Sequence, residues 1–385
     1  MNELRHKTKI VAFYDKSDFK DENRVYSPST VTVVDYMSDC LRRLGKQVEI
    51  ISAAETRNGR GFYRFRSNEV SKGITLTQGF TIGFNNRFLR SVSKSVSRLW
   101  LVSYLLKNTF YGERIVFYDQ PVLYIPLLLF RILSKHKRVI VIYFASELFQ
   151  KVYNFGWLKR ELELYLFAKA DRLVVSTELL NMQINKQGRP YTIMHGTYRV
   201  AEKSREFFGD GLIHIVYAGI INAKKGSRQA VDLAGHLNKN YMIHILGFGV
   251  ASELEYIKER IHDSNMHHAC KVSYEGVLSG REYEIFLQKC HIGLCTQNLN
   301  EAYNDSSFPS KILVYLANGL RVVSVRLDAI ENSEIGDLLY YSNSDKSKDI
   351  SDAIMKIDFN ESYDSRAKIE QLDKKFLQEF GALIR

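Results

Sequence analysis

The chain has few cysteines and few prolines. Its 385 residues include only 4 Cys and 5 Pro, and no two cysteines stand at CxxC spacing. A disulfide-bonded scaffold, a collagen-like repeat and a low-complexity chain are therefore excluded. We expect Cys40, Cys270, Cys290 and Cys295 to be buried thiols in a reducing compartment. A chain of this length with 45% hydrophobic residues is typical of two domains with sizeable cores.

Long apolar runs are also lacking. The first residues, MNELRHKTKIVAFYD, are charged throughout, which is not the pattern of a secretory signal. The most apolar stretch, residues 115–133, contains Asp119, Pro121, Pro126 and Arg131. We interpret it as a strand, a loop and a buried helix rather than a membrane span. We therefore expect a cytoplasmic protein, or one held peripherally on the inner face of the cell membrane.

Acidic residues are scarce in the first half of the chain. Residues 1–200 hold 32 Lys and Arg against 17 Asp and Glu, a net charge of +15, whereas the remainder carries −4. The densest stretch, residues 57–108, has ten cations, interleaved aromatic residues and the single acid Glu69. Such a charge favours an anionic partner. No helix-turn-helix, zinc-finger or RNP pattern accompanies it, so we do not expect nucleic acid.

Residues 85–108 predict an amphipathic helix. Four cations recur at spacings of three, four and four, while Leu89, Val92, Val96 and Leu99 follow on another face. A basic helix with aromatic residues can lie on an anionic bilayer. The candidate membrane face comprises Arg87, Arg90, Lys94, Arg98 and Trp100. The alternative is a solvated cationic face over an ordinary core stripe.

Apolar, β-branched runs alternate with helical patterns along the chain. Strands are predicted at 9–15, 47–52, 114–119, 138–144, 172–178, 212–220, 241–249, 271–276, 291–298 and 321–326. A helix is predicted at 27–45, with Ser27 as N-cap, Pro28 at the first position and Gly45 just past the end. This order predicts an α/β fold of two doubly wound parallel sheets.

The domain boundaries follow from a polar, glycine-containing segment at 202–211, which we interpret as a linker. We divide the chain into a first domain at 1–201, a second at 202–365 and a final helix at 366–385. Ligands of such folds bind at the carboxyl ends of the strands. Candidate site residues are therefore sought in the loops that follow them.

Glycines and a lysine follow two strands of the second half. A strand ends at Gly219 and Lys225 comes six residues later. A glycine there lets the backbone approach a phosphate, and the lysine can neutralise it. Gly247 and Gly249 form a similar pair, but they lack the third glycine of a dinucleotide fingerprint. Each pattern alone is also met by an ordinary strand-to-helix turn.

The strongest local signal is NDSSFPSKILVYLANG at 304–319. Ser306, Ser307 and Ser310 crowd the predicted start of a helix, beside Lys311. Free amides and the positive end of the helix dipole, with these hydroxyls and the ammonium, would make a diphosphate cradle. The alternative is a capped core helix, which would use the serines but has no need of Lys311.

In this order and spacing, VYAGIINAKKG, ILGFG, SYEGVLSGREYEIFLQKCHIGLC and SFPSKILVYLANGLRVVS resemble the donor half of GT-B nucleotide-sugar glycosyltransferases. The likeness is greatest to the large, mostly retaining, family 4-like group of bacterial surface polysaccharide synthesis. It covers 213–340 closely and 112–200 loosely. It implies two Rossmann-like domains facing a cleft, the first on the acceptor side, the second for the donor, with a C-terminal helix that can cross back to the first.

The resemblance assigns roles to matching residues. Lys225 and Lys311 stand where the family binds the diphosphate, and Glu147 matches an acidic position after a strand. The implied catalytic residues are Glu147, Lys225 and Lys311, the implied donor-binding residues are Gly219, Lys225, Gly247, Gly249, Asn304, Asp305, Ser306, Ser307, Ser310 and Lys311, and the acceptor side comprises Ser27, Asp119, Ser146 and Glu147. In the donor half two positions depart from the family, because Ile220 replaces an arginine and Val314 replaces the ribose-binding glutamate.

The implied reaction transfers a sugar from a nucleotide diphosphate sugar to a hydroxyl of a glycan acceptor, which we expect to be linked to a polyprenyl diphosphate at an anionic membrane surface. The chain has no DxD motif, so we expect no metal and no cofactor besides this co-substrate. The lysines would stabilise the leaving diphosphate, and Glu147 would orient a hydroxyl or act as a base. Two alternatives remain open: a sugar-nucleotide epimerase, and a non-catalytic binding protein, which Ile220 and Val314 favour.

Overall fold

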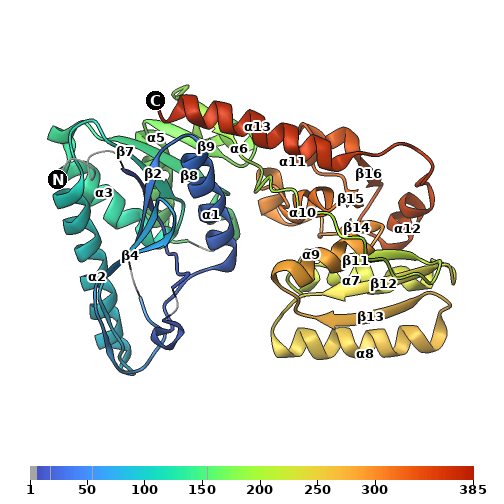
Figure 1. Ribbon diagram of the computed structural model, residues 1–385. Coiled ribbons are helices and arrows are strands. Elements are labelled where there is room, and N and C mark those ends of the chain that lie inside the picture. Colours follow the sequence, from blue (N-terminus) through green and yellow to red (C-terminus); the bar gives the residue numbers. More distant parts are fainter. Residues whose placement is uncertain (1–6, 18, 54, 154) are drawn as a thin grey trace. The chain divides into compact units, whose positions relative to one another are not determined.

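The computed structural model describes residues 7–17, 19–53, 55–153 and 155–385. Contacts divide the chain into two compact units, each built around its own sheet (Figure 1). Unit 1 comprises Met1–Met194 and Phe376–Arg385, and unit 2 comprises His195–Lys375. No helix in the described ranges is both long enough and apolar enough to span a bilayer.

Unit 1 is built on an eight-stranded sheet with the order β10-β9-β8-β7-β1-β2-β5-β4. Its strands are β1 (Lys7–Val11), β2 (Gln47–Ser52), β4 (Arg66–Ser71), β5 (Ile74–Gln78), β7 (Arg114–Tyr118), β8 (Ile140–Ala145), β9 (Arg172–Val175) and β10 (Tyr191–Ile193). Every neighbouring pair is parallel except the edge strand β4, which is antiparallel to β5. A separate antiparallel pair joins β3 (Phe62–Tyr63) to β6 (Thr81–Ile82).

The helices of unit 1 are α1 (Pro28–Arg43), α2 (Arg87–Asn108), α3 (Tyr124–Leu133), α4 (Phe149–Val152), α5 (Trp157–Lys169) and α6 (Glu178–Ile184), with the 3-10 turns η2 (Lys20–Glu22), η3 (Pro121–Leu123) and η4 (Lys135–Lys137). The start and end of α1 are as predicted: Ser27 is its N-cap, Pro28 its first residue, and Gly45 beyond its end has a φ of 74°. The strand residues Val11, Ile51 and Phe117 are buried in the core.

Unit 2 is built on a six-stranded, all-parallel sheet with the order β13-β12-β11-β14-β15-β16. Its strands are β11 (Ile213–Ala218), β12 (Tyr241–Leu246), β13 (Lys271–Gly276), β14 (Ile292–Cys295), β15 (Arg321–Val325) and β16 (Leu339–Ser342). Its helices are α7 (Ser227–Asp232), α8 (Ala251–His267), α9 (Gly280–Lys289), α10 (Lys311–Ala317), α11 (Asp328–Glu331) and α12 (Ser347–Met355), with the turns η5 (Ala223–Lys225), η6 (Leu233–Gly235), η7 (Ala302–Asp305) and η8 (Gly336–Leu338).

The final helix, α13 (Ser365–Leu383), belongs to both units. Its last turns pack in unit 1, where Phe376 stacks on Tyr36 with ring centroids 5.9 Å apart. Thr192 donates a hydrogen bond of 2.7 Å to Glu379, and Phe380 is fully buried. The end of the chain therefore returns to unit 1, as the resemblance implied.

Most predicted strands are present, and β2 and β13 have the predicted bounds. The sequence analysis was wrong about residues 62–82, where it placed no strands and the structure has β3, β4, β5 and β6. Because β4 is an edge strand whose residues are nearly all exposed, its sequence RSNEVS lacks the apolar alternation that marks a half-buried strand. All four cysteines are buried thiols outside any disulfide, as expected.

Candidate functional site

The strand order of unit 2 singles out one place for a ligand. Taken in chain order, the six strands are arranged 3-2-1-4-5-6, with β11 first and β14 fourth. The connections leaving these two neighbours diverge, and such a switch point in an open parallel sheet is where ligands bind, outside the carboxyl ends of the strands. Gly219 follows β11 and Thr296 follows β14 at this place.

Lys311 approaches Gly219 from the start of α10. A Cβ built on Gly219 would stand 3.5 Å from the Lys311 Nζ. The same ammonium lies 4.0 Å from the centroid of the Tyr217 ring, a cation–π contact. The Nζ atom is buried and has no hydrogen-bond partner among the described residues, although Lys311 as a whole is half-buried. A buried cation in this state is costly unless an anion joins it.

The electrostatics of the site link the two predicted lysines. The pKa of Lys311 is lowered to about 8, chiefly by burial; Cys295 opposes this shift and the charge of Lys225 contributes to it. Burial raises the pKa of the Cys295 thiol, and the charges of Lys311 and Lys225 oppose this. The structure therefore brings Lys225 and Lys311 close enough to act on the same groups.

Tyr217 of β11 contacts the elements that carry both lysines. Its ring faces Lys311, and its hydroxyl donates to the backbone oxygens of Ile220 at 2.8 Å and Lys225 at 3.0 Å. The Lys225 ammonium lies 3.9 Å from the centroid of the Tyr303 ring. A single buried tyrosine thus holds η5, with Lys225, next to the Lys311 ammonium. Neither tyrosine was among the predicted site residues.

Glycines bring the strand ends into close contact. A Cβ on Gly247 would lie 1.7 Å from the carbonyl oxygen of Gly219, and one on Gly249 would lie 2.5 Å from that of Ile221. Gly226 has a φ of 87°, and its Cβ would lie 2.0 Å from the carbonyl oxygen of Thr296. A side chain at any of these positions collides with backbone, so the loops after β11, β12 and β14 pack together only with glycine there.

The segment before α10 differs from the prediction. Ser306 and Ser307 do not lie at the start of the helix, which begins only at Lys311 with Ser310 as its N-cap. They follow η7, and the Ser307 hydroxyl donates to the carbonyl of Tyr303 at 2.6 Å. The cause is Pro309, because the residue before a proline disfavours helical geometry. That residue, Phe308, instead stacks on His195 with centroids 4.5 Å apart.

The side chain of Asn304 makes hydrogen bonds within its own loop. Its amide nitrogen donates to the carbonyls of Asn298 at 2.8 Å and Leu299 at 3.2 Å, and its oxygen accepts from Gln297 at 2.6 Å. The side chain of Asp305 lies outside the described part of the structure. Among the described residues, no three His, Cys, Asp or Glu side chains are grouped as metal ligands.

In unit 1, three predicted acceptor-side residues lie at the carboxyl ends of β7 and β8. Asp119 is completely buried and accepts a hydrogen bond of 2.8 Å from the Tyr143 hydroxyl. Burial raises the pKa of Asp119 well above its usual value, and the charge of Glu147 adds to the effect. The charge of Glu147 raises the pKa of Tyr118, whereas a hydrogen bond with Ser146 lowers it. Ser27 is the N-cap of α1, with its hydroxyl 2.8 Å from that of Ser29.

Glu163 of α5 positions the segment after Glu147, and the sequence analysis missed it. Its carboxylate accepts from the Tyr124 hydroxyl at 2.8 Å and from the amides of Phe149 at 2.8 Å and Gln150 at 3.2 Å. These amides begin α4, directly beyond the loop that carries Glu147. The signal that could have found it is an acid three residues before Leu166, at a spacing that places both on the buried side of α5.

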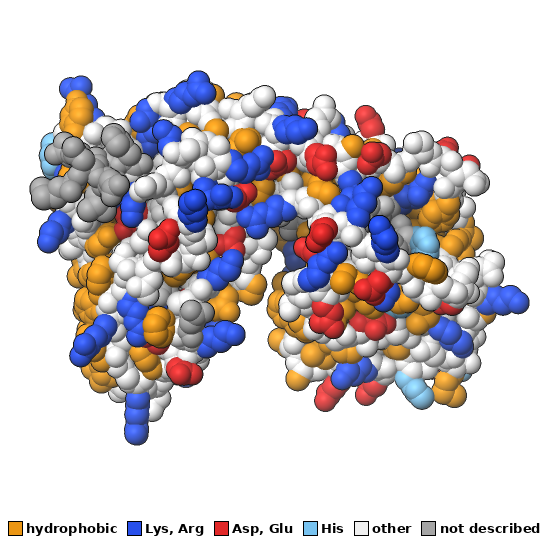
Figure 2. All heavy atoms as spheres, in the orientation of Figure 1, with side chains coloured by type: hydrophobic (Ala, Val, Ile, Leu, Met, Phe, Trp, Pro, Cys, Tyr) orange, Lys and Arg blue, Asp and Glu red, His pale blue; other side chains and the backbone are white. Residues whose placement is uncertain are grey.

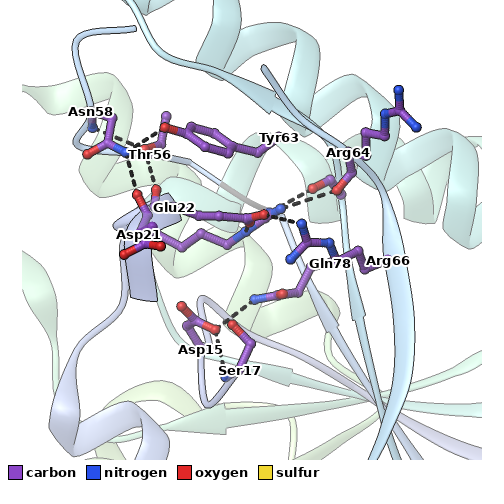
Figure 3. Close-up of polar contacts among 12 residues, drawn as sticks. Asp15, Ser17, Asp21, Glu22, Thr56, Asn58, Tyr63, Arg64, Arg66 and Gln78 are labelled. Atoms are coloured by element: carbon purple, nitrogen blue, oxygen red, sulfur yellow. Dashed lines mark hydrogen bonds and ion pairs between the residues drawn. The ribbon is translucent and has the colours of Figure 1, made fainter. Parts of the chain in front are cut away.

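A buried ion cluster fastens the loop after β1 to the strands β4 and β5 (Figure 3). The Glu22 carboxylate accepts from Arg24 at 2.6 Å and from Arg66 at 2.6 Å. Arg24 also donates to the carbonyl of Gly79 at 2.8 Å, and Gln78 donates to Asp15 at 3.0 Å. The cluster is fully hydrogen-bonded at Glu22 and Arg24, which is the condition under which buried charges are tolerated.

The residues of the candidate membrane face are largely engaged within unit 1. Lys94 and Arg98 pair with the buried Glu55 at 3.1 Å and 2.8 Å. Arg90 donates to the carbonyl of Phe84 at 3.0 Å. Trp100 stacks against Tyr104 with centroids 5.1 Å apart, and Arg87 is exposed. Arg90, Lys94 and Arg98 are therefore bonded within unit 1, whereas Arg87 lies on its surface.

Comparison with known proteins identifies the fold. No family model matches the chain, and no curated protein matches its sequence. Solved structures do match. A structure of trehalose-6-phosphate synthase, OtsA, has a TM-score of 0.69 at 11% identity, with 97% of each chain covered. The Anabaena protein HepE, in complex with UDP and glucose, has a TM-score of 0.67 at 10% identity, with 98% of each chain covered.

A third structure, trehalose-6-phosphate from E. coli bound with UDP-2-fluoro glucose, has a TM-score of 0.66 at 11% identity, with 97% of each chain covered. The fold is GT-B. The predicted pair of Rossmann-like domains is thereby confirmed. At these identities the likeness is one of fold, and the placement within the family 4-like group stays a prediction.

Proposed function

We propose that the chain is a glycosyltransferase that moves a sugar from a nucleoside diphosphate sugar to a hydroxyl group. One observation carries the proposal: at the switch point of unit 2, the Lys311 ammonium is buried beside Gly219 without a hydrogen-bond partner among the described residues. Lys225 lies close enough to perturb its pKa. Two positive charges beside bare backbone suit a diphosphate. The UDP and UDP-2-fluoro glucose bound in matching structures support this choice.

The chemistry follows from where charge develops. When the glycosidic bond to the donor breaks, negative charge grows on the diphosphate oxygen that leaves. Lys225 and Lys311 stabilise that charge, and groups fixed in advance of the reaction do this with little reorganisation. Ser310 and the first amides of α10 offer further donors next to Lys311. In this proposal the chain's own ammonium groups take the part that a divalent metal plays elsewhere.

Glu147 is the proposed acceptor-side group. It follows β8 and is half-buried, and its charge raises the pKa of Asp119 and of Tyr118. Its proposed role is to orient a sugar hydroxyl near the reacting carbon. In a retaining transfer, which we favour from the resemblance, an oxygen of the leaving diphosphate accepts the proton of the acceptor hydroxyl. In an inverting transfer Glu147 accepts it instead.

The proposed acceptor is a glycan carried on a polyprenyl diphosphate, in bacterial surface polysaccharide synthesis. The support is the charge of residues 1–200, +15, which suits an anionic carrier at an anionic membrane. The proposed location is accordingly the inner face of the cell membrane, without a spanning segment.

The test is an incubation with a panel of nucleotide sugars, with and without a lipid-linked glycan acceptor. Acceptor-dependent release of free nucleotide supports transfer. A changed sugar without nucleotide release would show an epimerase instead, and thermal stabilisation without turnover would show a binding protein. Lys225→Ala is expected to lower turnover strongly, whereas Lys224→Ala is the matched control, because Lys224 is exposed and pairs with Glu301 at 3.1 Å.

A further inference from the structure

The chain enters unit 2 at His195, and this side chain packs beside the start of α10. The His195 ring is buried and stacks on Phe308, with ring centroids 4.5 Å apart and 30° between the ring planes. Phe308 stands three residues before Lys311, and Pro309 between them restricts the backbone on both sides of it. A stacked ring at Phe308 therefore helps to fix the place where α10 begins.

Gly196 brings the same segment into contact with α10 itself. A Cβ built on Gly196 would stand 2.9 Å from the Cδ1 atom of Leu313 and 3.4 Å from the Cβ atom of Ser310. Ser310 is the N-cap of α10 and directly precedes Lys311. The φ of Gly196 lies outside the left-handed region, so glycine is needed here for space rather than for a turn. The backbone at Gly196 thus lies against the helical turn that carries Lys311.

The connection by which the chain leaves unit 2 holds the other end of α10. Ser365, the first residue of α13, is buried and donates a hydrogen bond of 2.8 Å to the carbonyl of Leu316. The next side chain, Arg366, lies beside Gly319, where a Cβ would stand 3.5 Å from its Cδ atom. Arg366 also donates to the carbonyl of Ala201 in the entering segment. Both connections between the units are therefore fastened to the helix that carries the buried lysine.

The overall charge of the second half of the chain does not favour an anion. Residues 201–385 hold 22 Lys and Arg against 26 Asp and Glu, a net charge of −4. On the face of unit 2 that Figure 2 shows, acidic and basic side chains are interspersed. A surface of this kind does not concentrate anions by a long-range field. Affinity for a diphosphate must then come from cations at contact distance, and the Lys311 ammonium acts only where α10 places it.

We propose that His195 and Gly196 are positioning residues for the donor site, which hold the Lys311 ammonium beside Gly219 by packing against the start of α10. Binding groups lose their effect when they are displaced by more than about 0.5 Å, so the segment that joins the units sets part of the donor affinity. The inference rests on the proposed function for its ligand. The placement of Lys311, however, is measurable without any ligand, so the two proposals can fail separately.

The first test changes the ring at position 195. His195→Phe keeps a ring that can stack on Phe308, whereas His195→Ala removes it. Isotope-labelled lysine side chains are followed by NMR against pH, and the Lys311 signal is the one that is missing from Lys311→Met. Burial holds the pKa of Lys311 at about 8. In His195→Ala a less firmly held α10 admits water, so this pKa is expected to rise toward 10.5.

UDP affinity is measured by calorimetry on the same variants. His195→Ala is expected to weaken UDP binding by about tenfold, and His195→Phe to keep both the affinity and the Lys311 pKa of the wild type. The matched control is His291→Ala, because this ring packs on Phe359 and precedes β14, at the edge of the sheet opposite the site. It is expected to lower stability and to change neither quantity.

The outcomes separate the two proposals. An unchanged Lys311 pKa in His195→Ala, or the same rise in His195→Phe, overturns the positioning role. A wild-type chain that does not bind UDP, but whose Lys311 pKa responds to His195→Ala alone, supports the positioning role and contradicts the donor site.

The second test uses the contact of Gly196 with α10. Gly196→Ala is expected to weaken UDP binding by about tenfold, because the added methyl group displaces Leu313 and the turn with it. Gly196→Ala/Leu313→Val removes the atom that the methyl group meets, and should recover most of the affinity. Leu313→Val alone measures the effect of the smaller side chain. If the double variant is folded by thermal unfolding but binds UDP no better than Gly196→Ala, the contact with α10 does not position Lys311.

Discussion

The ammonium of Lys311 faces the bare backbone of Gly219, with 3.5 Å between its Nζ and the place where a Cβ would stand. The ammonium is buried and makes no hydrogen bond to a described residue. Keeping a lysine in this state costs free energy, because burial disfavours the charged form. A residue that destabilises the protein without ligand in this way is expected to bind an anionic group of a ligand.

The first prediction is that Lys311→Met stabilises the free protein and abolishes nucleotide binding. Lowering the pKa of Lys311 from 10.5 to about 8 disfavours its charged form at neutral pH by roughly 3 kcal/mol. Methionine fills a similar volume without the charge, so the free energy of unfolding should rise by an amount of that order. Urea unfolding at pH 7 measures it, and calorimetry with UDP measures the binding.

The control for this prediction is Lys224→Met. Its ammonium group is exposed and forms an ion pair at the surface, so its removal should change stability by less than about 0.5 kcal/mol. If Lys311→Met destabilised the protein and left UDP affinity intact, Lys311 would be a structural residue.

The second prediction concerns pH. In the protein without ligand, Lys311 has a pKa of about 8. A bound diphosphate favours the charged form and raises that pKa. Binding therefore takes up a proton above pH 8, and affinity for a nucleotide sugar falls by up to about tenfold for each pH unit above this value. Below pH 8 the affinity should change little. Calorimetry between pH 7 and 9.5 in buffers of different ionisation enthalpy follows both the affinity and the proton.

Lys311→Arg tests the cause of this pH dependence, because a guanidinium stays charged throughout the range. Its affinity is expected to be lower than that of the wild type at pH 7 but flat with pH. A wild-type profile without a decline above pH 8, or the same decline in the arginine variant, would assign the titration to another group.

The third prediction separates steric collision from backbone strain. A Cβ at Gly247 would meet the carbonyl oxygen of Gly219 at 1.7 Å, whereas Gly276, which also ends a strand, has a φ of 73° and nothing within 4 Å of its Cβ position. Gly276→Ala is expected to cost about 1 kcal/mol of stability, from the left-handed backbone alone. Gly247→Ala should cost about 3 kcal/mol or more and weaken UDP binding, since the Gly219 backbone must shift. Equal losses in urea unfolding would contradict the close packing of these strand ends.

The fourth prediction is an acid-sensitive unit 2. Burial lowers the pKa of His244 below its usual value of 6.5, while a hydrogen bond to Glu275 opposes the shift. His244 also lies 2.9 Å from His214, which is 2.9 Å from Asp210. The unfolded chain binds a proton at His244 before the folded chain does, so stability present above pH 6.5 is lost as pH falls toward the lowered pKa.

Urea midpoints between pH 7.5 and 5.5 measure this loss. His244→Gln is expected to be less stable at pH 7.5 but to lose less over the same range, because the titrating group is gone. An unchanged slope in this variant would assign the acid sensitivity to other groups, of which His291 is the nearest in kind, since burial lowers its pKa too.

The sequence predicted most of the parallel strands because a strand buried on both faces is a continuous apolar run, as in β2 and β13. It also assigned Lys225 and Lys311 to one diphosphate, from the order of motifs in a resembled family rather than from the lysines themselves, and this assignment stays a prediction. It could not predict Tyr217 or Glu163 in the sites. Their positions follow the same periodicity as core residues, and only the assembled fold shows what their polar atoms contact.

The helix α2 shows why a pattern alone is insufficient. Its apolar and basic stripes were both evident from the sequence, but a stripe states only that one side of a helix differs from another. Which side packs is decided by neighbours far along the chain, here Gly79 and Ile82.

The start of α10 was misplaced for a local reason: Pro309 separates Ser306 and Ser307 from the helix.

The most direct test of the account is calorimetric titration of UDP into the wild-type chain, Lys225→Ala, Lys311→Met and the double variant. If both ammonium groups hold one diphosphate, each single variant should weaken UDP binding by about tenfold or more. The double variant should lose less binding free energy than the sum of the two single losses, because the effects of neighbouring groups on one ligand are not additive. UDP affinity that is unchanged in both single variants would contradict the claim that Lys225 and Lys311 form a nucleotide diphosphate site.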